Sequence, residues 1–156
     1  METQEYKIEK VDFNLYIDEW TSLFDEHWDE VAKNKQLMKI SPDYERYAAL
    51  GKLGKLKSLV AYRGDEVVGY SVNILDKHLH YSDLAVAYND LLFVKKEYRN
   101  SPVGLRLIRQ TEKYMAEEGA QLMFWHAKEQ TSLAKILPAL RYNTHEIMFS
   151  KELKRG

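Results

Sequence analysis

The chain contains no cysteine among its 156 residues. Disulfide bonds, thiolate metal sites and cysteine nucleophiles are therefore excluded. A surplus of one charge is also missing, because 23 Lys and Arg residues stand against 24 Asp and Glu residues and the net charge is −1. This balance argues against a dominant electrostatic grip on nucleic acid, which needs a basic surplus or a basic face.

Long apolar runs and targeting segments are missing too. No apolar stretch reaches membrane-spanning length, and the opening residues METQEYKIEK are too polar for a signal peptide. No internal repeat and no linker rich in Pro, Gly or Ser divides the chain. With 45% hydrophobic and 30% charged residues, we expect one globular domain over residues 1–156, in the cytoplasm and without a membrane partner.

Hydrophobic periodicity predicts the elements of the first third. Tyr6–Val11 reads as a short strand, and residues 15–33 read as an amphipathic helix. Its apolar stripe is formed by Ile17, Trp20, Phe24, Trp28 and Val31, of which we expect the aromatic members in the core. The opposite face carries Glu26, His27 and Glu30, which line either an acceptor site or solvent. Ser41 and Pro42 are typical of a helix start, and that helix runs to about Leu50.

The remaining chain alternates strands and helices. Strands are expected at Ser58–Tyr62, Glu66–Leu75 and Leu84–Val94, then at Gln121–Ala127 with both faces covered, and finally at His145–Leu153. Helices are expected from Gly104 to a stop at Gly119 and around residues 133–140. The pattern predicts a mixed α/β domain. The helix between Val94 and Leu122 makes a crossover, so the strands that it joins should be parallel neighbours or near-neighbours.

The turn Arg99-Asn100-Ser101-Pro102-Val103-Gly104 connects a strand to a helix and contains no carboxylate. Unpaired N–H groups at a helix N-terminus suit a phosphate or pyrophosphate group. Gly104 would let such a ligand approach the backbone closely, because no Cβ intervenes. The alternative is that this turn is only a connection.

The same turn, preceded by Val94-Lys95-Lys96-Glu97-Tyr98, resembles the signature of the GNAT superfamily of acyl-CoA-dependent N-acetyltransferases. That signature is Arg or Gln, two residues, Gly, one residue, then Gly or Ala; here Pro102 replaces the first Gly and Gly104 keeps the last position. The stretch His78-Leu79-His80-Tyr81 with Asn89-Asp90 is also similar to GNAT proteins encoded by bacteriophages. The resemblance implies an α/β, three-layer domain whose twisted, splayed mixed sheet is flanked by helices.

The resemblance further implies acetyl-CoA as cofactor and a primary amine as acceptor. A homodimer is compatible with this expectation. A backbone N–H at Phe93 or Val94 would polarise the thioester. The turn residues expected at the cofactor are Arg99, Asn100, Ser101, Val103, Gly104, Leu105 and Arg106, and the Ser101 hydroxyl could replace the donor lost at Pro102. Lys95 and Lys96 belong to the same basic cluster, which could reach the phosphates of coenzyme A. Arg109 either joins this cluster or, like Lys113, belongs to a solvated helix face. A nucleic-acid-binding module using the cluster is the rival interpretation.

Asp90 and Tyr88 are the candidate catalytic residues. The strand position at which the family often carries a Glu base is Tyr88, and the carboxylate instead stands two residues on at Asp90, which shares the strand face of Tyr88. An Asp within the apolar run LAVAYNDLLFV is costly to bury unpaired. It is therefore either hydrogen-bonded for structure or held with a raised pKa for proton transfer.

The family's general acid, a Tyr, is missing. With Tyr142 aligned to the last aromatic of the family pattern, Leu137 takes the place of the Tyr and Gln130 that of an Asn. Tyr88, His126 or water could serve instead, or the thiolate leaves unassisted, or the protein binds acyl-CoA without turnover. The pair His78 and His80 favours a hairpin-surface or acceptor-pocket role over a metal site.

Overall fold

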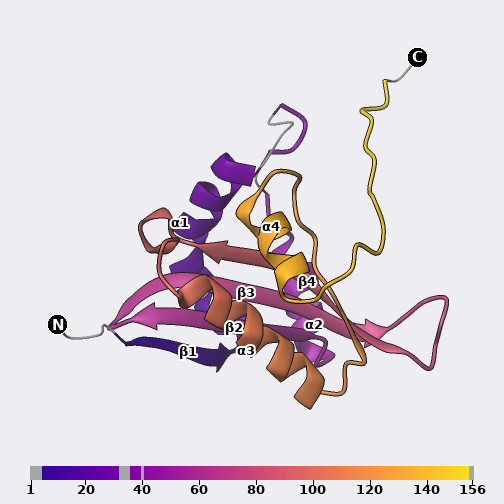
Figure 1. The fold of residues 1–156 in the computed structure, drawn as a ribbon, viewed down its shortest axis with the longest axis horizontal. Helices are drawn as coiled ribbons and strands as arrows, with labels where there is room; N and C mark the ends of the chain where they lie inside the picture. Colours follow the sequence, from indigo (N-terminus) through magenta and orange to yellow (C-terminus); the bar gives the residue numbers. More distant parts are fainter. Residues whose placement is uncertain (1–4, 32–35, 40, 155–156) are drawn as a thin grey trace. The chain divides into compact units, whose positions relative to one another are not determined.

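The computed structural model describes residues 5–31, 36–39 and 41–154. These fall into two compact units, Met1–His126 and Ala127–Gly156 (Figure 1). The first unit contains a five-stranded sheet and three α-helices, and the second contains helix α4 (Ser132–Ala139). Among the described residues, no helix combines the length and the apolar character needed to cross a bilayer.

The sheet has its strands in sequence order. They are β1 (Tyr6–Val11), β2 (Leu56–Arg63), β3 (Glu66–Lys77), β4 (Ala85–Val94) and β5 (Leu122–Phe124). β1 to β4 are antiparallel neighbours, and the predicted crossover is confirmed because β5 pairs parallel with β4. The predicted turn between β2 and β3 is also present, and Gly64 adopts a positive φ of 61° there.

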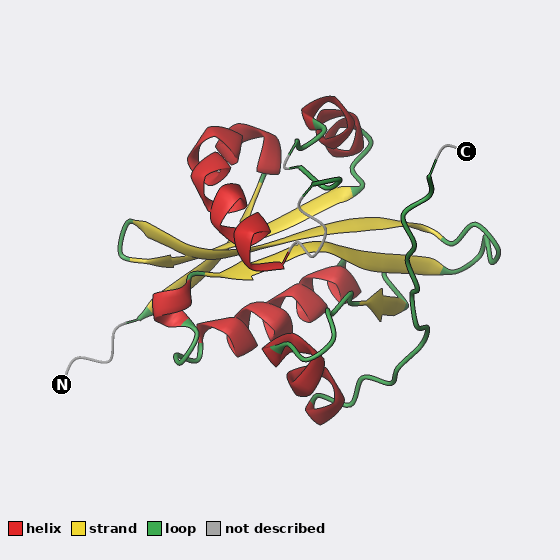
Figure 2. Cartoon of the chain, turned by 90° about the horizontal axis from the view of Figure 1, so that it is seen from above, coloured by secondary structure: helices red, strands yellow, loops and turns green. Residues whose placement is uncertain are grey.

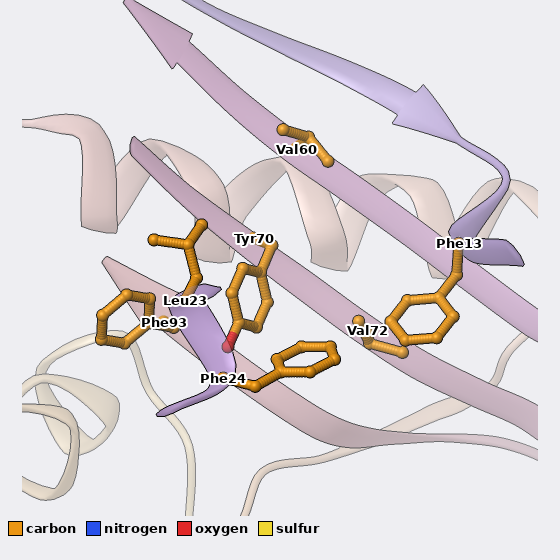
Figure 3. Close-up of a cluster of buried hydrophobic side chains, with 7 residues drawn as sticks. All are labelled: Phe13, Leu23, Phe24, Val60, Tyr70, Val72 and Phe93. Carbon is orange, nitrogen blue, oxygen red and sulfur yellow. The ribbon is translucent and has the colours of Figure 1, made fainter. Parts of the chain in front are cut away.

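Helices cover both faces of this sheet, which confirms the mixed three-layer fold (Figure 2). One face is covered by α1 (Phe13–Val31) and α2 (Tyr44–Lys52), the other by α3 (Val103–Glu117). Between α1 and the sheet, seven buried side chains form a hydrophobic cluster, drawn in Figure 3: Phe13, Leu23 and Phe24 of α1, and Val60, Tyr70, Val72 and Phe93 of the strands. Under α3, Val103 and Leu107 pack on Leu59, Ala61 and Val68. Along β2, Val60 on one face and Leu59 and Ala61 on the other follow the two-residue period of a strand. On β3, a register shift next to Gly69 leaves Val68 without a partner on β2, so Val68 lies on the face opposite to Tyr70.

A β-bulge interrupts β4. Val72 faces Leu91 and Asn73 faces Asn89, so Asp90 is an extra residue without a partner on β3. A bulge of this kind turns two successive side chains to one face of the sheet. Accordingly, Asp90 contacts α2 while Leu91 packs in the α1 core.

Buried polar side chains hold the bulge from the α3 face. Asn89 Nδ2 donates to Asn73 Oδ1 at 2.9 Å and, across the bulge, to the carbonyl of Leu91 at 3.0 Å. Asn73 Nδ2 donates to Ser71 Oγ at 3.0 Å, and Thr111 Oγ1 of α3 lies 2.9 Å from the same oxygen. Because all four polar side chains are buried, each relies on these partners for hydrogen bonds.

Three expectations about the elements are wrong. The cap of α2 is Asp43, whose carboxylate accepts from the N–H of Arg46 at 3.1 Å, and Ser41 precedes it in an exposed coil. The strand expected at Gln121–Ala127 is only three residues long, and Leu122 is 41% exposed rather than covered on both faces.

The strand expected at His145–Leu153 is an exposed coil, with Phe149 exposed to 87%. Alternating sequence alone cannot make a strand, since its backbone groups need a neighbouring strand to pair with.

The structure describes only part of the helix predicted over residues 15–33. The side chains of Ile17, Trp20 and Val31, and the whole of residues 32–33, lie outside the described residues. Phe24 is buried as expected. Trp28 is half-buried and donates to the carbonyl of Met38 at 2.5 Å.

Replacing Asn89 with Leu should destabilise the protein by about 3 kcal/mol, because Asn73 Oδ1 and the Leu91 carbonyl would stay buried without their donor. Chemical denaturation measures this loss. The control is Asn143→Leu at an exposed position, which should change the free energy of unfolding by no more than about 0.5 kcal/mol. Equal stability of the Asn89 variant and the wild type would show that the polar cluster does not hold the bulge.

Candidate active site

The turn before α3 presents two free backbone amides. Pro102 is the N-cap residue and has no N–H, and the N–H of Val103 donates to Ser101 Oγ at 3.3 Å. For the amides of Gly104 and Leu105, the described part of the chain offers no hydrogen-bond acceptor. Two N–H groups at the positive end of the α3 dipole are thus available to an anion.

The hydroxyl of Ser101 does not replace the donor lost at Pro102. It donates to the carbonyl of Tyr98 at 2.5 Å while it accepts from Val103. Both of its roles are therefore used within the turn, which corrects the expectation from the sequence. Ser101 stabilises the turn, because its hydroxyl joins the Tyr98 carbonyl to the N–H of Val103.

Packing within the protein does not require glycine at position 104. A Cβ built there would lie 3.8 Å from Val94 Cγ2, which is an ordinary contact, and the residue has no positive φ. Glycine costs helical stability relative to alanine, so this position is filled against local propensity. The glycine leaves the backbone of the first helical turn uncovered by a side chain of its own.

Most of the basic side chains near the turn have partners within the protein. Lys95 pairs with Glu66 at 3.1 Å, and Arg106 donates to the carbonyl of Tyr6 at 3.1 Å. Arg99 forms an ion pair with Glu30 of α1 and donates through Nε to the Val94 carbonyl at 2.9 Å. Arg99 thereby ties α1 to the end of β4, whereas Lys96 and Arg109 are exposed.

The register of β4 shows which of its amides face away from β3. The N–H of Lys95 donates to the Val68 carbonyl at 2.8 Å, and hydrogen-bonded pairs alternate along an antiparallel ladder. The Phe93 amide therefore points to Tyr70 of β3, and the amides of Leu92 and Val94 point to the opposite edge. β5 pairs with β4 only from Val86 to Tyr88, so the described sheet leaves this edge unpaired beyond that point.

Asp90 is exposed, which corrects the expectation of a carboxylate within an apolar environment. The bulge turns its side chain to the α1–α2 face, where Tyr47 Oη of α2 donates to Asp90 Oδ2 at 2.5 Å. Tyr88 lies half-buried, two residues before, and its ring stacks on Phe124 of β5 with 5.2 Å between ring centroids. A carboxylate and a phenol thus lie close together on β4.

His27 faces the sheet, contrary to its expected place on the outer face of the helix. Its Nδ1 lies 3.1 Å from Tyr70 Oη, and its ring stacks on Phe93 at 5.0 Å. Burial lowers the pKa of His27 to about 4, so the imidazole is neutral at neutral pH. Burial also raises the pKa of the Tyr70 phenol.

The other predicted residues belong neither to β4 nor to the turn before α3. Leu137, at the position of the family's Tyr, belongs to α4 of the second unit, and His126 is exposed at the end of the first. His78 and His80 follow β3 in the hairpin loop, with the His80 N–H donating to His78 Nδ1 at 3.0 Å. Within the described ranges, no three His, Asp or Glu side chains gather as metal ligands would.

Sequence reasoning missed the bulge and Tyr47. A signal for the bulge exists, because Asn89 and Asp90 place two polar residues in succession where a strand should alternate. No signal points to Tyr47, which lies 43 residues before Asp90 and reaches it only through the packing of α2.

The stability of the fold should depend on the protonation of His27. Its pKa is about 4 in the folded protein against 6.5 in the unfolded chain, so the unfolded state binds the proton first as the pH falls. The free energy of unfolding should therefore keep the full contribution of the neutral, buried His27 above pH 6.5 and lose it as the pH falls towards 4. His27→Gln should flatten the pH dependence in this window, as measured by denaturation at several pH values with His126→Gln as control. An unchanged slope would contradict the buried, neutral state of His27.

Comparison with known proteins identifies the family of the chain. The model of the acetyltransferase (GNAT) family matches residues 14–136. A search of curated proteins gave no match. Among solved structures, an aminoglycoside acetyltransferase from an uncultured soil metagenomic sample, in complex with sisomicin, has a TM-score of 0.72 at 21% identity, covering 96% of this chain and 97% of that chain.

Two further structures share the fold at lower identity. The ribosomal-protein-alanine N-acetyltransferase from Brucella melitensis biovar Abortus 2308 has a TM-score of 0.67 at 14% identity, covering 97% of this chain and all (100%) of its own. An aminoglycoside N-acetyltransferase in complex with CoA also has a TM-score of 0.67 at 14% identity, covering 95% and 100%. The chain therefore belongs to the GNAT family of acetyltransferases, whose cofactor is acetyl-CoA.

Proposed function

We propose that the protein transfers an acetyl group from acetyl-CoA to a primary amine by direct attack in a ternary complex. The observation that carries this proposal is the bulge in β4. It places the exposed carboxylate of Asp90 two residues before the outward amide of Leu92. A proton acceptor and a donor for a carbonyl oxygen are thereby built into one short segment.

The cofactor would be held mainly by backbone. The free amides of Gly104 and Leu105 suit its pyrophosphate, and the outward amides of Leu92 and Val94 suit the groups that follow along the open edge of β4. When bound, acetyl-CoA supplies the activated acetyl thioester. Arg99 contributes by fixing the turn to β4 and α1, since its guanidinium is already engaged there. Of the other predicted residues, Asn100 is exposed in the turn before α3, and Arg106 directly follows the free amides with its guanidinium bonded to the Tyr6 carbonyl.

Asp90 would accept the proton of the acceptor amine, directly or through water. Tyr88 is the second candidate on the same strand. The sequence has no cysteine for a covalent acyl-enzyme, which favours direct attack. Leu137 cannot donate a proton, so the leaving thiolate must be protonated by water or by another group. The alternative function, acyl-CoA binding without turnover, follows if no such proton source exists.

A cationic amine is the acceptor class that the α1–α2 side favours. The sequence of α1 contains several Asp and Glu residues but no Lys or Arg, and Asp90 faces the same side of the sheet. The structural relatives named above acetylate aminoglycosides or a ribosomal-protein alanine according to their names. Sisomicin, spermidine and a peptide with an N-terminal alanine are therefore suitable first acceptors.

Gly104→Glu should abolish acetyl-CoA binding, because it adds bulk and negative charge beside the free amides. Gly104→Ala is the matched control: its Cβ is tolerated by Val94, so the melting temperature should stay equal or rise, while affinity falls by about tenfold or less. Calorimetry with acetyl-CoA measures both. A folded Gly104→Glu protein with wild-type affinity would refute this cofactor site. Binding of DNA or RNA with steep salt dependence, without acetyl-CoA affinity, would favour the nucleic-acid interpretation.

Asp90→Asn should lower the rate of thiol release roughly a hundredfold or more, the usual contribution of a positioned base. Acetyl-CoA affinity and melting temperature should barely change, because the side chain is exposed and distant in sequence from the turn. Asp65→Asn, in the exposed turn between β2 and β3, is the control. A destabilised Asp90→Asn protein that keeps full activity would mean that Asp90 is structural. A wild-type protein that binds acetyl-CoA but releases no thiol with any amine would establish the binding-only alternative.

A further inference from the structure

The carboxylate of Asp90 is held through one oxygen only. Tyr47 Oη donates to Oδ2 at 2.5 Å. In the described part of the chain, Oδ1 meets no hydrogen-bond donor, although the side chain is exposed to solvent. The contact therefore separates a fixed oxygen from a free one.

Tyr47 itself is anchored before it reaches Asp90. Its ring packs against Phe13 of α1 with 4.7 Å between centroids and borders the buried cluster of that face. Its backbone carbonyl accepts from Asn14 Nδ2 of α1 at 3.4 Å. The hydroxyl is thus presented from a preset position, and little conformational freedom is lost when it holds the carboxylate.

The Tyr47 phenol keeps its proton at neutral pH and can therefore donate it in a hydrogen bond to Asp90. Burial, reinforced by the hydrogen bond to Asp90, raises the pKa of Tyr47 well above its ordinary value. Besides the Asp90 carboxylate, Tyr44 on the same helix and Tyr70 of β3 interact with it electrostatically, and both are phenols. The proton therefore stays on Tyr47, and Asp90 keeps the role of acceptor.

We propose that Tyr47 is a positioning residue, which fixes Asp90 Oδ2 so that Oδ1 faces the acceptor amine. This inference rests on the proposed function, in which Asp90 accepts the amine proton. Without the Tyr47 hydroxyl, the Asp90 side chain would sample other rotamers, and the distance from Oδ1 to the amine would vary. A variable distance between Oδ1 and the amine slows the proton transfer without altering how the cofactor binds.

The test replaces Tyr47 with Phe, which keeps the ring against Phe13 and removes only the hydroxyl. We expect kcat for thiol release to fall about tenfold, with acetyl-CoA KM and melting temperature nearly unchanged. The acceptor is whichever of sisomicin, spermidine and the alanine peptide reacts fastest with the wild type. Tyr44→Phe is the control, because Tyr44 lies on the same helix, is 41% exposed and donates no described hydrogen bond to Asp90. Full activity of Tyr47→Phe would overturn the inference.

A double-mutant cycle separates positioning from a structural role. If Tyr47 acts through Asp90, then adding Tyr47→Phe to Asp90→Asn should lower kcat by less than about twofold further. The same fractional loss in both backgrounds would show that Tyr47 affects the rate independently of Asp90, and would overturn the inference.

A readout without turnover separates this inference from the proposed function. The ¹³C carboxyl resonance of Asp90, assigned with Asp90→Asn, should move in Tyr47→Phe and stay in place in Tyr44→Phe. An unmoved resonance would refute the contact even if the enzyme is active, and the proposed function would stand. Absence of thiol release by the wild type would refute the proposed function and, with it, the role of Tyr47 in catalysis.

Discussion

The extra residue in β4 is the constraint on which the candidate site depends. Without it, β4 would alternate regularly, and Asp90 would occupy a paired position in the ladder. The buried amide of Asn89 keeps the irregularity in place, because it donates to the Leu91 carbonyl on the far side of the bulge and to Asn73 on the neighbouring strand. A buried amide left without these partners would be costly, so the bulge and the polar cluster stabilise each other.

One consequence of the bulge appears on each side of β4. On the α1–α2 face, Asp90 projects outward and meets Tyr47. Along the open edge, the amides of Leu92 and Val94 point away from β3. Under the proposed function, the direction of Asp90 and the direction of the Leu92 and Val94 amides both depend on this one bulge. Arg99 adds a second connection, since it joins α1 to the Val94 carbonyl.

The sequence predicts most of the sheet and the α3 turn, because hydrophobic periodicity and turn residues act locally. Strands β1 to β4, the parallel crossover and α3 are confirmed, and the Arg99–Gly104 turn begins α3 as expected. What could not be predicted depends on contacts distant in sequence. The His145–Leu153 segment alternates like a strand but has no pairing strand in the described structure. We expected Asp90 to be buried because the residues around it in the sequence are apolar. The bulge instead turns its side chain to the α1–α2 face, where it is exposed. Ser101, Arg99 and Lys95 were expected at the ligand but have partners within the protein.

The most direct measurement is an amide NMR titration of the protein with acetyl-CoA. If the bulge directs the β4 edge to the cofactor, the amide resonances of Leu92, Val94, Gly104 and Leu105 should shift and gain protection from hydrogen exchange. The Phe93 amide, already paired with β3, should show protection before the cofactor is added. Protection of Phe93 appearing only with the cofactor, or unchanged signals for Leu92 and Val94 at saturating acetyl-CoA, would contradict this role of the bulge.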